Sequence, residues 1–193
     1  PIPASERRRI QDLLACTRGG AKGVFLLDPA SAALELKPLL SGPLRAGPAT
    51  PDGAALLLLP TEEDAPGPPL RLLPLRPQGA PRPLGPTAGH VRDPSWAPDG
   101  RWLVFESGWR SEHDLYRVDR DGGGLRRLTD NPEGNFQPAV SPRGSAIAFL
   151  SSRDHGAELY RMQPDGSTAR RLTHTPKDEW APAWAPDASL LSF

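Results

Sequence analysis

The sequence predicts an all-β protein built from repeated four-stranded antiparallel units, because three short phrases recur at one fixed interval. A Pro-x-x-x-Pro-x-x phrase occupies residues 94–100, 138–144 and 182–188, so it returns every 44 residues. Leu-Tyr-Arg at 115–117 and 159–161, and Leu-Thr at 128–129 and 172–173, keep the same interval. Self-similarity at 40 to 50 residues is typical of repeat architectures, in which no unit buries its apolar face alone.

The first half of the template repeat predicts a hairpin. Residues 95–97 are short and apolar at their centre, which favours an inner strand. Residues 97–100, Ala-Pro-Asp-Gly, are a turn: proline presets φ, aspartate bonds the backbone nearby and glycine accepts a positive φ. Residues 102–105, Trp-Leu-Val-Phe, have the β-branched and aromatic composition of a buried strand.

The second half predicts an outer pair of strands. Residues 107–114 are polar and are expected to form a loop, residues 115–119 a third strand, and residues 121–124 a glycine-rich turn. Residues 125–129 complete the unit as a short fourth strand. Four antiparallel strands in each 44-residue unit are typical of a β-propeller blade. No window after residue 90 shows helical periodicity.

The same register extends to the start of the chain. A shift of 135 residues places residues 14–18 over 149–153 and residues 24–27 over 159–162. Residues 62–83 are rich in proline, which cannot donate to a strand ladder, so edge strands or irregular loops are expected there. We therefore predict one propeller domain over 1–193, with these units: diverged blade 1–44, diverged proline-rich blade 45–88, regular blades 89–132 and 133–176, and partial blade 177–193.

Composition excludes several classes of protein. Lysine plus arginine equals aspartate plus glutamate, 23 each, so there is no basic footprint of a nucleic-acid binder. The longest apolar run, residues 54–59, is far too short to span a membrane. The chain begins at Pro1 and stops at Phe193 inside an apolar run, and we expect it to be part of a longer protein.

The single cysteine permits two interpretations. Leu13-Leu14-Ala15-Cys16 matches a bacterial lipoprotein cleavage box and follows three arginines, but only residues 10–12 separate the two features. A signal peptide needs about 7 to 15 apolar residues at that point. The repeat register explains the same letters as a strand, and we favour a buried, unreactive thiol.

The spaced phrases together resemble the propeller repeat of the TolB family, strongly over residues 92–193. The resemblance implies a ring of six blades, of which this chain supplies four and part of a fifth. It also implies a periplasmic or cell-envelope location and a protein or peptide partner. Arg143 and Ala188 depart from the turn pattern. An unclosed ring would expose strand edges and permit self-association.

The sequence contains no recognisable catalytic or cofactor-binding motif. There is no Gly-x-Ser-x-Gly elbow, and His90, His113, His155 and His174 show no metal-ligand spacing. Gly122-Gly123-Gly124 precedes no helix, so it does not resemble a phosphate loop. We therefore expect no enzyme activity, no cofactor and no metal.

Candidate binding residues cluster in the segments between blades and between second and third strands, which open onto one face of a propeller. Exposed loops with no ligand are the alternative interpretation. Trp96 and Trp184 share a repeat position with Val140 and are expected in the core, whereas an arginine after a strand, such as Arg153, often ties loops together. The candidates for partner binding are Trp109, Arg110, His113, Asn135, Arg153, His155, His174, Asp178, Glu179 and Trp180.

Three functions stay open. The first is a non-enzymatic scaffold that binds a protein or peptide on its loop-rich face. The second is the substrate-gating propeller of a prolyl-oligopeptidase-type serine peptidase whose catalytic domain lies outside this chain. The third is a carbohydrate-binding propeller, which predicts histidines and carboxylates converging in one pocket.

Overall fold

The computed structural model confirms an all-β fold of four-stranded antiparallel sheets, and its described residues contain no helix. The chain divides into two compact units, residues 1–87 and 88–193, which are treated separately below. The six-bladed ring and the blade boundaries stay predictions. The residues that the structure describes are 23–27, 36–61, 69–75, 77–86, 89–109, 112–154 and 156–193.

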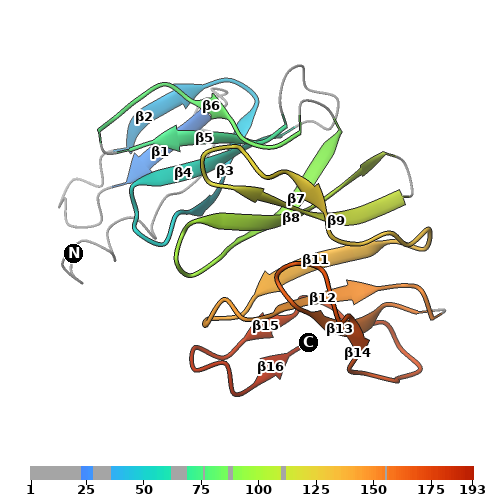
Figure 1. Ribbon diagram of the computed structural model, residues 1–193. Coiled ribbons are helices and arrows are strands. Elements are labelled where there is room, and N and C mark those ends of the chain that lie inside the picture. Colours follow the sequence, from blue (N-terminus) through green and yellow to red (C-terminus); the bar gives the residue numbers. More distant parts are fainter. Residues whose placement is uncertain are drawn as a thin grey trace. The chain divides into compact units, whose positions relative to one another are not determined.

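The first unit contains a two-stranded and a four-stranded antiparallel sheet (Figure 1). The smaller sheet pairs β1 (Gly23–Leu27) with β2 (Leu36–Ser41). The larger has the order β3 (Leu44–Ala49), β4 (Ala55–Pro60), β5 (Arg71–Pro74) and β6 (Arg82–Pro83). The expected strand around Cys16 lies outside the described residues.

The core of the first unit joins these two sheets. Val24 of β1 is buried together with Leu56 and Leu58 of β4 and Leu73 of β5. As the proline content predicts, β6 is an edge strand of only two residues.

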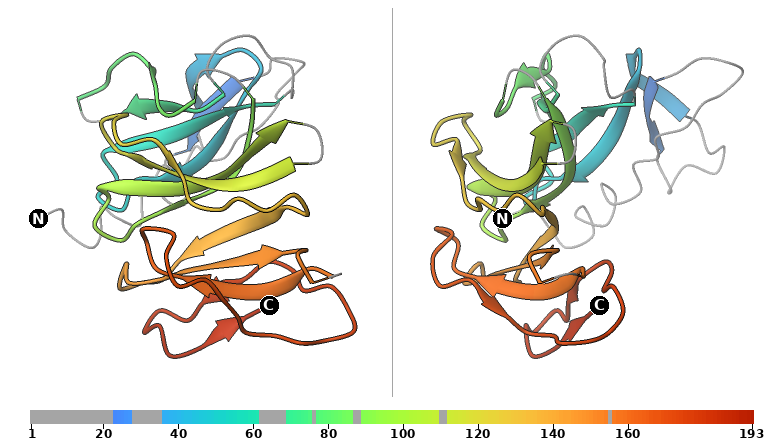
Figure 2. Two further views of the ribbon diagram at one scale, coloured as in Figure 1. Left: turned by 45° about the vertical axis from the view of Figure 1, so that its right-hand side comes forward. Right: turned by 90° about the vertical axis from the view of Figure 1, so that its right-hand side faces the viewer.

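The second unit contains two four-stranded sheets and a two-stranded one, all antiparallel. Figure 2 shows them following one another in chain order, and contacts of β11 with β7 and with β15 agree with that arrangement. The strands are β7 (His90–Trp96), β8 (Trp102–Trp109), β9 (Glu112–Asp119), β10 (Arg126–Arg127), β11 (Asn135–Val140), β12 (Ile147–Ser151), β13 (Glu158–Met162), β14 (Arg170–Arg171), β15 (Ala183–Trp184) and β16 (Leu191–Ser192).

The inner hairpins of the second unit close with the predicted turns. Gly100 and Gly144 both adopt φ 68°, and the N–H of Gly100 donates to the Ala97 carbonyl at 2.9 Å. Ala188 occupies the same turn position with φ 62°. A left-handed backbone is unfavourable for alanine, so this turn keeps its geometry at a local conformational cost.

The predicted loop at residues 107–114 is wrong. β8 and β9 continue as a ladder that pairs Ser107 with Asp114 and Trp109 with Glu112. Backbone pairing needs no apolar side chains, and two of the polar ones, Asp114 and His113, have partners elsewhere in the fold. His113, within the expected loop, consequently lies in β9, and His90 lies in β7.

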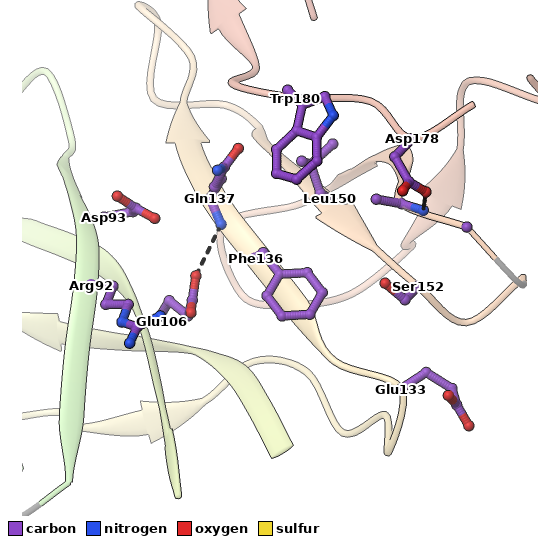
Figure 3. A pocket seen from close by; sticks show the side chains of 12 residues that line it. Arg92, Asp93, Glu106, Glu133, Phe136, Gln137, Leu150, Ser152, Asp178 and Trp180 are labelled. Atoms are coloured by element: carbon purple, nitrogen blue, oxygen red, sulfur yellow. Dashed lines mark hydrogen bonds between the residues drawn. The ribbon is translucent and has the colours of Figure 1, made fainter. Parts of the chain in front are cut away.

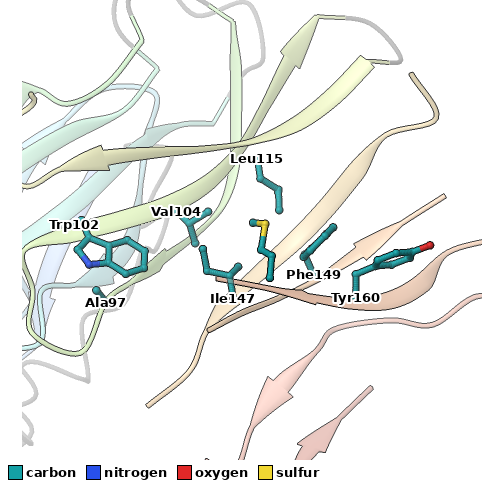
Figure 4. Close-up of a cluster of buried hydrophobic side chains, with 8 residues drawn as sticks. Ala97, Trp102, Val104, Leu115, Ile147, Phe149 and Tyr160 are labelled. Atoms are coloured by element: carbon teal, nitrogen blue, oxygen red, sulfur yellow. The ribbon is translucent and has the colours of Figure 1, made fainter. Parts of the chain in front are cut away.

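The core of the second unit lies between its two four-stranded sheets (Figure 4). The buried cluster consists of Ala97, Trp102, Val104 and Leu115 from one sheet and Ile147, Phe149, Tyr160 and Met162 from the other. Trp96 is buried as expected. Trp184 is half-buried, and its indole N–H donates to the Ala139 carbonyl at 3.0 Å.

Within the described part of the chain, no helix has the length and apolar character needed to cross a membrane.

Candidate binding site

The second unit has a left-handed residue at the same position of each repeat, and in β7 and β11 it lies at a bulge. Asp93, Gln137 and Ala181 directly precede prolines, lie 44 residues apart and have φ of 45°, 49° and 50°. The N–H of Gln137 donates to Glu106 Oε2 at 3.3 Å, and that of Ala181 donates to Gln137 Oε1 at 2.8 Å. The backbone at Gln137 and at Ala181 is thus held by a side chain of the preceding sheet.

A buried carboxylate fixes the start of β9. Asp114 accepts hydrogen bonds from Arg127 Nε at 3.0 Å, from the Thr129 hydroxyl at 2.7 Å and from Asn135 Nδ2 at 2.9 Å. The Thr129 oxygen in turn accepts the N–H of Leu115 at 3.0 Å. This carboxylate–arginine–threonine clamp joins β9, β10 and the start of β11.

The same clamp recurs one repeat later. Glu158 accepts hydrogen bonds from Thr173 at 2.6 Å, from Arg171 at 2.5 Å and from the N–H of Thr175 at 3.1 Å. Burial alone would raise the pKa of Glu158, but these hydrogen bonds outweigh it and lower the pKa below 4.5. Both clamp carboxylates are therefore fully engaged in holding strands together.

Arg153 links three strands of the sheet β11–β14 to one another. Its guanidinium donates to Asn135 Oδ1 at 3.0 Å and to the Ser151 hydroxyl at 2.9 Å, and it lies 4.7 Å from the centre of the Tyr160 ring. The Tyr160 hydroxyl donates to Asp154. Burial, with that hydrogen bond, raises the pKa of Tyr160 to about 12.

Beyond these contacts, the ends of the strands surround a pocket of about 530 Å³ (Figure 3). In the figure Phe136, Leu150 and Trp180 lie in the centre, with Asp178 on the opposite side from Asp93 and Glu106. The pocket is lined by Arg92, Asp93, Glu106, Glu133, Phe136, Gln137, Leu150, Ser152, Gly156, Ala157, Asp178 and Trp180.

The two sheets contribute opposite chemistry at equivalent repeat positions. Arg92, Phe136 and Trp180 are separated by 44 residues each, and so are Glu106 and Leu150. The sheet β7–β10 thus supplies a charged wall, whereas β11–β14 supplies an apolar one. Trp180 continues the aromatic side into the next segment and is 65% exposed.

Glu106 is the buried charge of this pocket. Its side chain lies 2.7 Å from His113 Nδ1, and the His113 ring packs 5.8 Å from the ring of Phe136. Burial raises the pKa of Glu106, and the nearby Asp93 adds to that, whereas His113 and the N–H of Gln137 oppose it.

The structure brings several predicted site residues to this pocket. Trp180 and Asp178 line it, and Asp178 also accepts the N–H of Ala157 at 2.8 Å. His113 does not line the pocket, but it contacts two residues that do, Glu106 and Phe136.

The other candidates are placed elsewhere or are not described. Asn135 bonds Asp114 across the two sheets, Arg153 bonds Asn135 within the sheet β11–β14, and Glu179 accepts a hydrogen bond from Thr175 at 2.9 Å. His174 is exposed in the segment after β14. Trp109 ends β8, its side chain is not described, and Arg110 and His155 lie outside the described residues.

Sequence reasoning missed Arg92, Asp93, Glu106, Phe136 and Gln137. An aromatic residue 44 positions before Trp180 could have found Phe136, and the position before the first proline of each phrase could have found Asp93 and Gln137, but neither signal marks Arg92 or Glu106. Among the described residues, no group of three or more histidine, cysteine, aspartate or glutamate side chains is placed to hold a metal ion.

Comparisons with known proteins agree with the resemblance seen in the sequence. Residues 21–193 match a family described as the TolB beta propeller domain. A protein of Agrobacterium tumefaciens assigned as TolB is 26% identical with a TM-score of 0.67, over 89% of this chain and 61% of that one. TolB from Acinetobacter baumannii is 21% identical with a TM-score of 0.69, over 87% and 41%. This chain therefore spans less than two thirds of either relative.

Enzymes also share the fold. An oligogalacturonate lyase in complex with manganese is 19% identical with a TM-score of 0.67, over 88% of this chain and 51% of that one. A puromycin hydrolase is 21% identical with a TM-score of 0.61, over 79% and 27%. At these identities the likeness concerns the fold alone.

Proposed function

This chain belongs to the TolB β-propeller domain family, and we propose that it is a non-enzymatic propeller segment that binds a protein or peptide partner on its loop-rich face. That face is formed by the strand ends around the pocket and the segments 128–134 and 172–182. The partner would be a polar segment with at least one side chain that enters the pocket.

The observation that carries this proposal is the contrast between engaged and unengaged side chains at the same strand ends. Asp114 and Glu158 are buried and hydrogen-bonded within the fold. Trp180 is largely exposed at the pocket, and among the described residues it has no hydrogen-bond partner, whereas Trp184 bonds the Ala139 carbonyl. Exposed aromatic side chains beside a pocket are typical anchors for a partner.

A second candidate is the substrate-gating propeller of a serine peptidase, favoured by the structural likeness to a puromycin hydrolase. The two functions differ in what the complete gene product does. Labelling of that product with a fluorophosphonate probe, followed by mass spectrometry, would support the peptidase and overturn the scaffold. An unlabelled product, with a known serine peptidase labelled in parallel, agrees with the scaffold.

The scaffold proposal is tested by selecting displayed peptides on the purified chain. Selected peptides are expected to bind the loop-rich face and to lose affinity on Trp180→Ala. Asp165→Asn, in the β13–β14 turn away from the pocket, is the matched surface control and should leave affinity unchanged. Peptides that bind but are insensitive to Trp180→Ala, with no NMR shifts around the pocket, would argue against this face.

The family also leads us to propose a periplasmic or cell-envelope location. Fractionation of the native bacterium, followed with an antibody against this chain, should find it with envelope markers. Recovery with cytoplasmic markers would contradict that part of the proposal.

A further inference from the structure

We propose that the pocket between β7–β10 and β11–β14 receives an arginine side chain of the partner peptide. This inference rests on the proposed function and adds the chemistry that the partner must present. It commits to a guanidinium group, so a lysine, an apolar side chain or an acidic side chain is excluded as the preferred occupant.

The charge of the pocket favours a cation. Its lining has four carboxylates, from Asp93, Glu106, Glu133 and Asp178, against the single guanidinium of Arg92. Asp93 and Glu133 are exposed, and no described residue forms a hydrogen bond or ion pair with either carboxylate. Two negative charges thus face the pocket without a partner in the described part of the chain.

The aromatic side chains favour the same ligand. Trp180 is 65% exposed and Phe136 is half-buried beside it, with Leu150 beneath (Figure 3). Tryptophan is the best aromatic partner for a cation, and arginine is the cation found most often over such rings. The described part of the chain contains such contacts already, with Arg117 4.2 Å from the centre of the Trp102 ring and Arg153 over Tyr160.

Shape separates arginine from lysine. A guanidinium is planar, weakly hydrated and able to stack on a ring while donating sideways to carboxylates. In Figure 3 Trp180 and Phe136 lie between the carboxylates of Asp93 and Glu106 on one side and of Asp178 on the other. The aliphatic stem of arginine can lie against Leu150. A lysine ammonium would gain the charge attraction but lose the stacking.

The probe for this proposal is the tripeptide acetyl-Gly-Arg-Gly-amide, with lysine, norleucine and glutamate versions as comparators. Each is titrated into the full chain labelled with ¹⁵N, and the indole N–H of Trp180 is followed by NMR. The arginine peptide is expected to bind more tightly than the lysine one and clearly more tightly than norleucine. Affinity should fall with added salt, because the carboxylates that attract the probe are exposed.

Two variants that each neutralise one exposed carboxylate of the pocket test its charge. Asp93→Asn suits the site because asparagine tolerates a left-handed backbone as aspartate does. Asp93→Asn and Glu133→Gln should each weaken the arginine probe about two- to five-fold, and more when combined. Asp99→Asn makes the same charge change in the β7–β8 turn, outside the pocket lining, and should have no effect.

Trp180→Ala tests the stacking and is expected to weaken the arginine probe about two- to five-fold. Equal binding of the arginine and lysine peptides would overturn the guanidinium preference, and equal binding of norleucine would overturn the whole inference. Displayed peptides that need Trp180 but contain no required arginine would leave the proposed function standing and remove only this inference.

Discussion

The sheets β7–β10 and β11–β14 share one scaffold but differ at nearly every side chain that reaches the pocket. Both have a buried carboxylate at the start of the third strand, held by an arginine and a threonine from the fourth. At the pocket, however, Arg92 and Glu106 of one sheet correspond to Phe136 and Leu150 of the other. The difference indicates that the clamp fixes the strand ends and leaves the adjacent positions free to carry binding chemistry.

The four-stranded sheet of the first unit shows which part of this scaffold is dispensable. The backbone hydrogen bond from the N–H of Leu84 to the carbonyl of Leu70 is equivalent to the one from Leu128 to Leu115 and aligns the two sheets. In this alignment, Pro83 and Gly85 occupy the positions of the clamp residues Arg127 and Thr129. Four strands therefore pair without a clamp.

The largest loss of stability is expected for variants of the core, which test whether the two sheets share it. Leu115→Ala and Phe149→Ala each truncate a fully buried side chain of that core, one from each sheet. Each should lower the free energy of unfolding by about 3 to 5 kcal/mol, measured by urea denaturation. A loss below about 1 kcal/mol in only one variant would show that the sheets do not depend equally on this core.

The next effect tests the clamp. Asp114→Ala removes the acceptor for Arg127, Thr129 and Asn135, and should cost about 2 to 3 kcal/mol of unfolding free energy. Glu133→Ala removes an exposed carboxylate near the same strands and should stay within about 0.5 kcal/mol. Similar losses of unfolding free energy in the two variants would mean that the clamp stabilises the fold no more than an exposed carboxylate does.

A fall in pH should have opposite effects on the contributions of the two buried glutamates to stability. The lowered pKa of Glu158 means that its contribution to stability is complete above about 4.5 and is lost as the pH falls through its folded pKa. The raised pKa of Glu106 means that folding becomes less favourable as the pH rises from about 4.5 through its folded pKa. Carboxyl NMR titration should give midpoints on opposite sides of 4.5, and a midpoint for Glu106 below Glu158 would contradict this assignment.

The smallest change in stability is expected for the substitution of an exposed pocket residue. Trp180→Ala should change the free energy of unfolding by less than about 0.5 kcal/mol, because the side chain is mostly exposed. Phe136→Ala, at the equivalent position, should cost more because its ring is half-buried against His113. Thermal unfolding of both variants checks the order, and a large loss for Trp180→Ala would indicate a structural role.

Much of the fold could be predicted from the spacing of the phrases, but the pocket could not. The turn at 97–100 and the strand at 102–105 follow from local chemistry, and both are present. The hairpin over 107–114 was predicted as a loop because its side chains are polar. Asp114 is satisfied by Thr129 and Asn135, which are distant in sequence, and those pairings cannot be read from a local window.

By itself, the 44-residue period determined the all-β class and the four-stranded unit, because backbone pairing and turn geometry depend on neighbouring residues. It also marked Asp178 and Trp180 as candidates. Only the tertiary structure decided that Trp180 shares a pocket with Glu106 and Phe136, and that Asn135 joins the two sheets with Arg153 bonded to it. The physical reason is that equivalent repeat positions from successive sheets meet across their packed faces. The chemistry of the pocket is therefore set by differences between repeats, whereas the fold is set by what the repeats share.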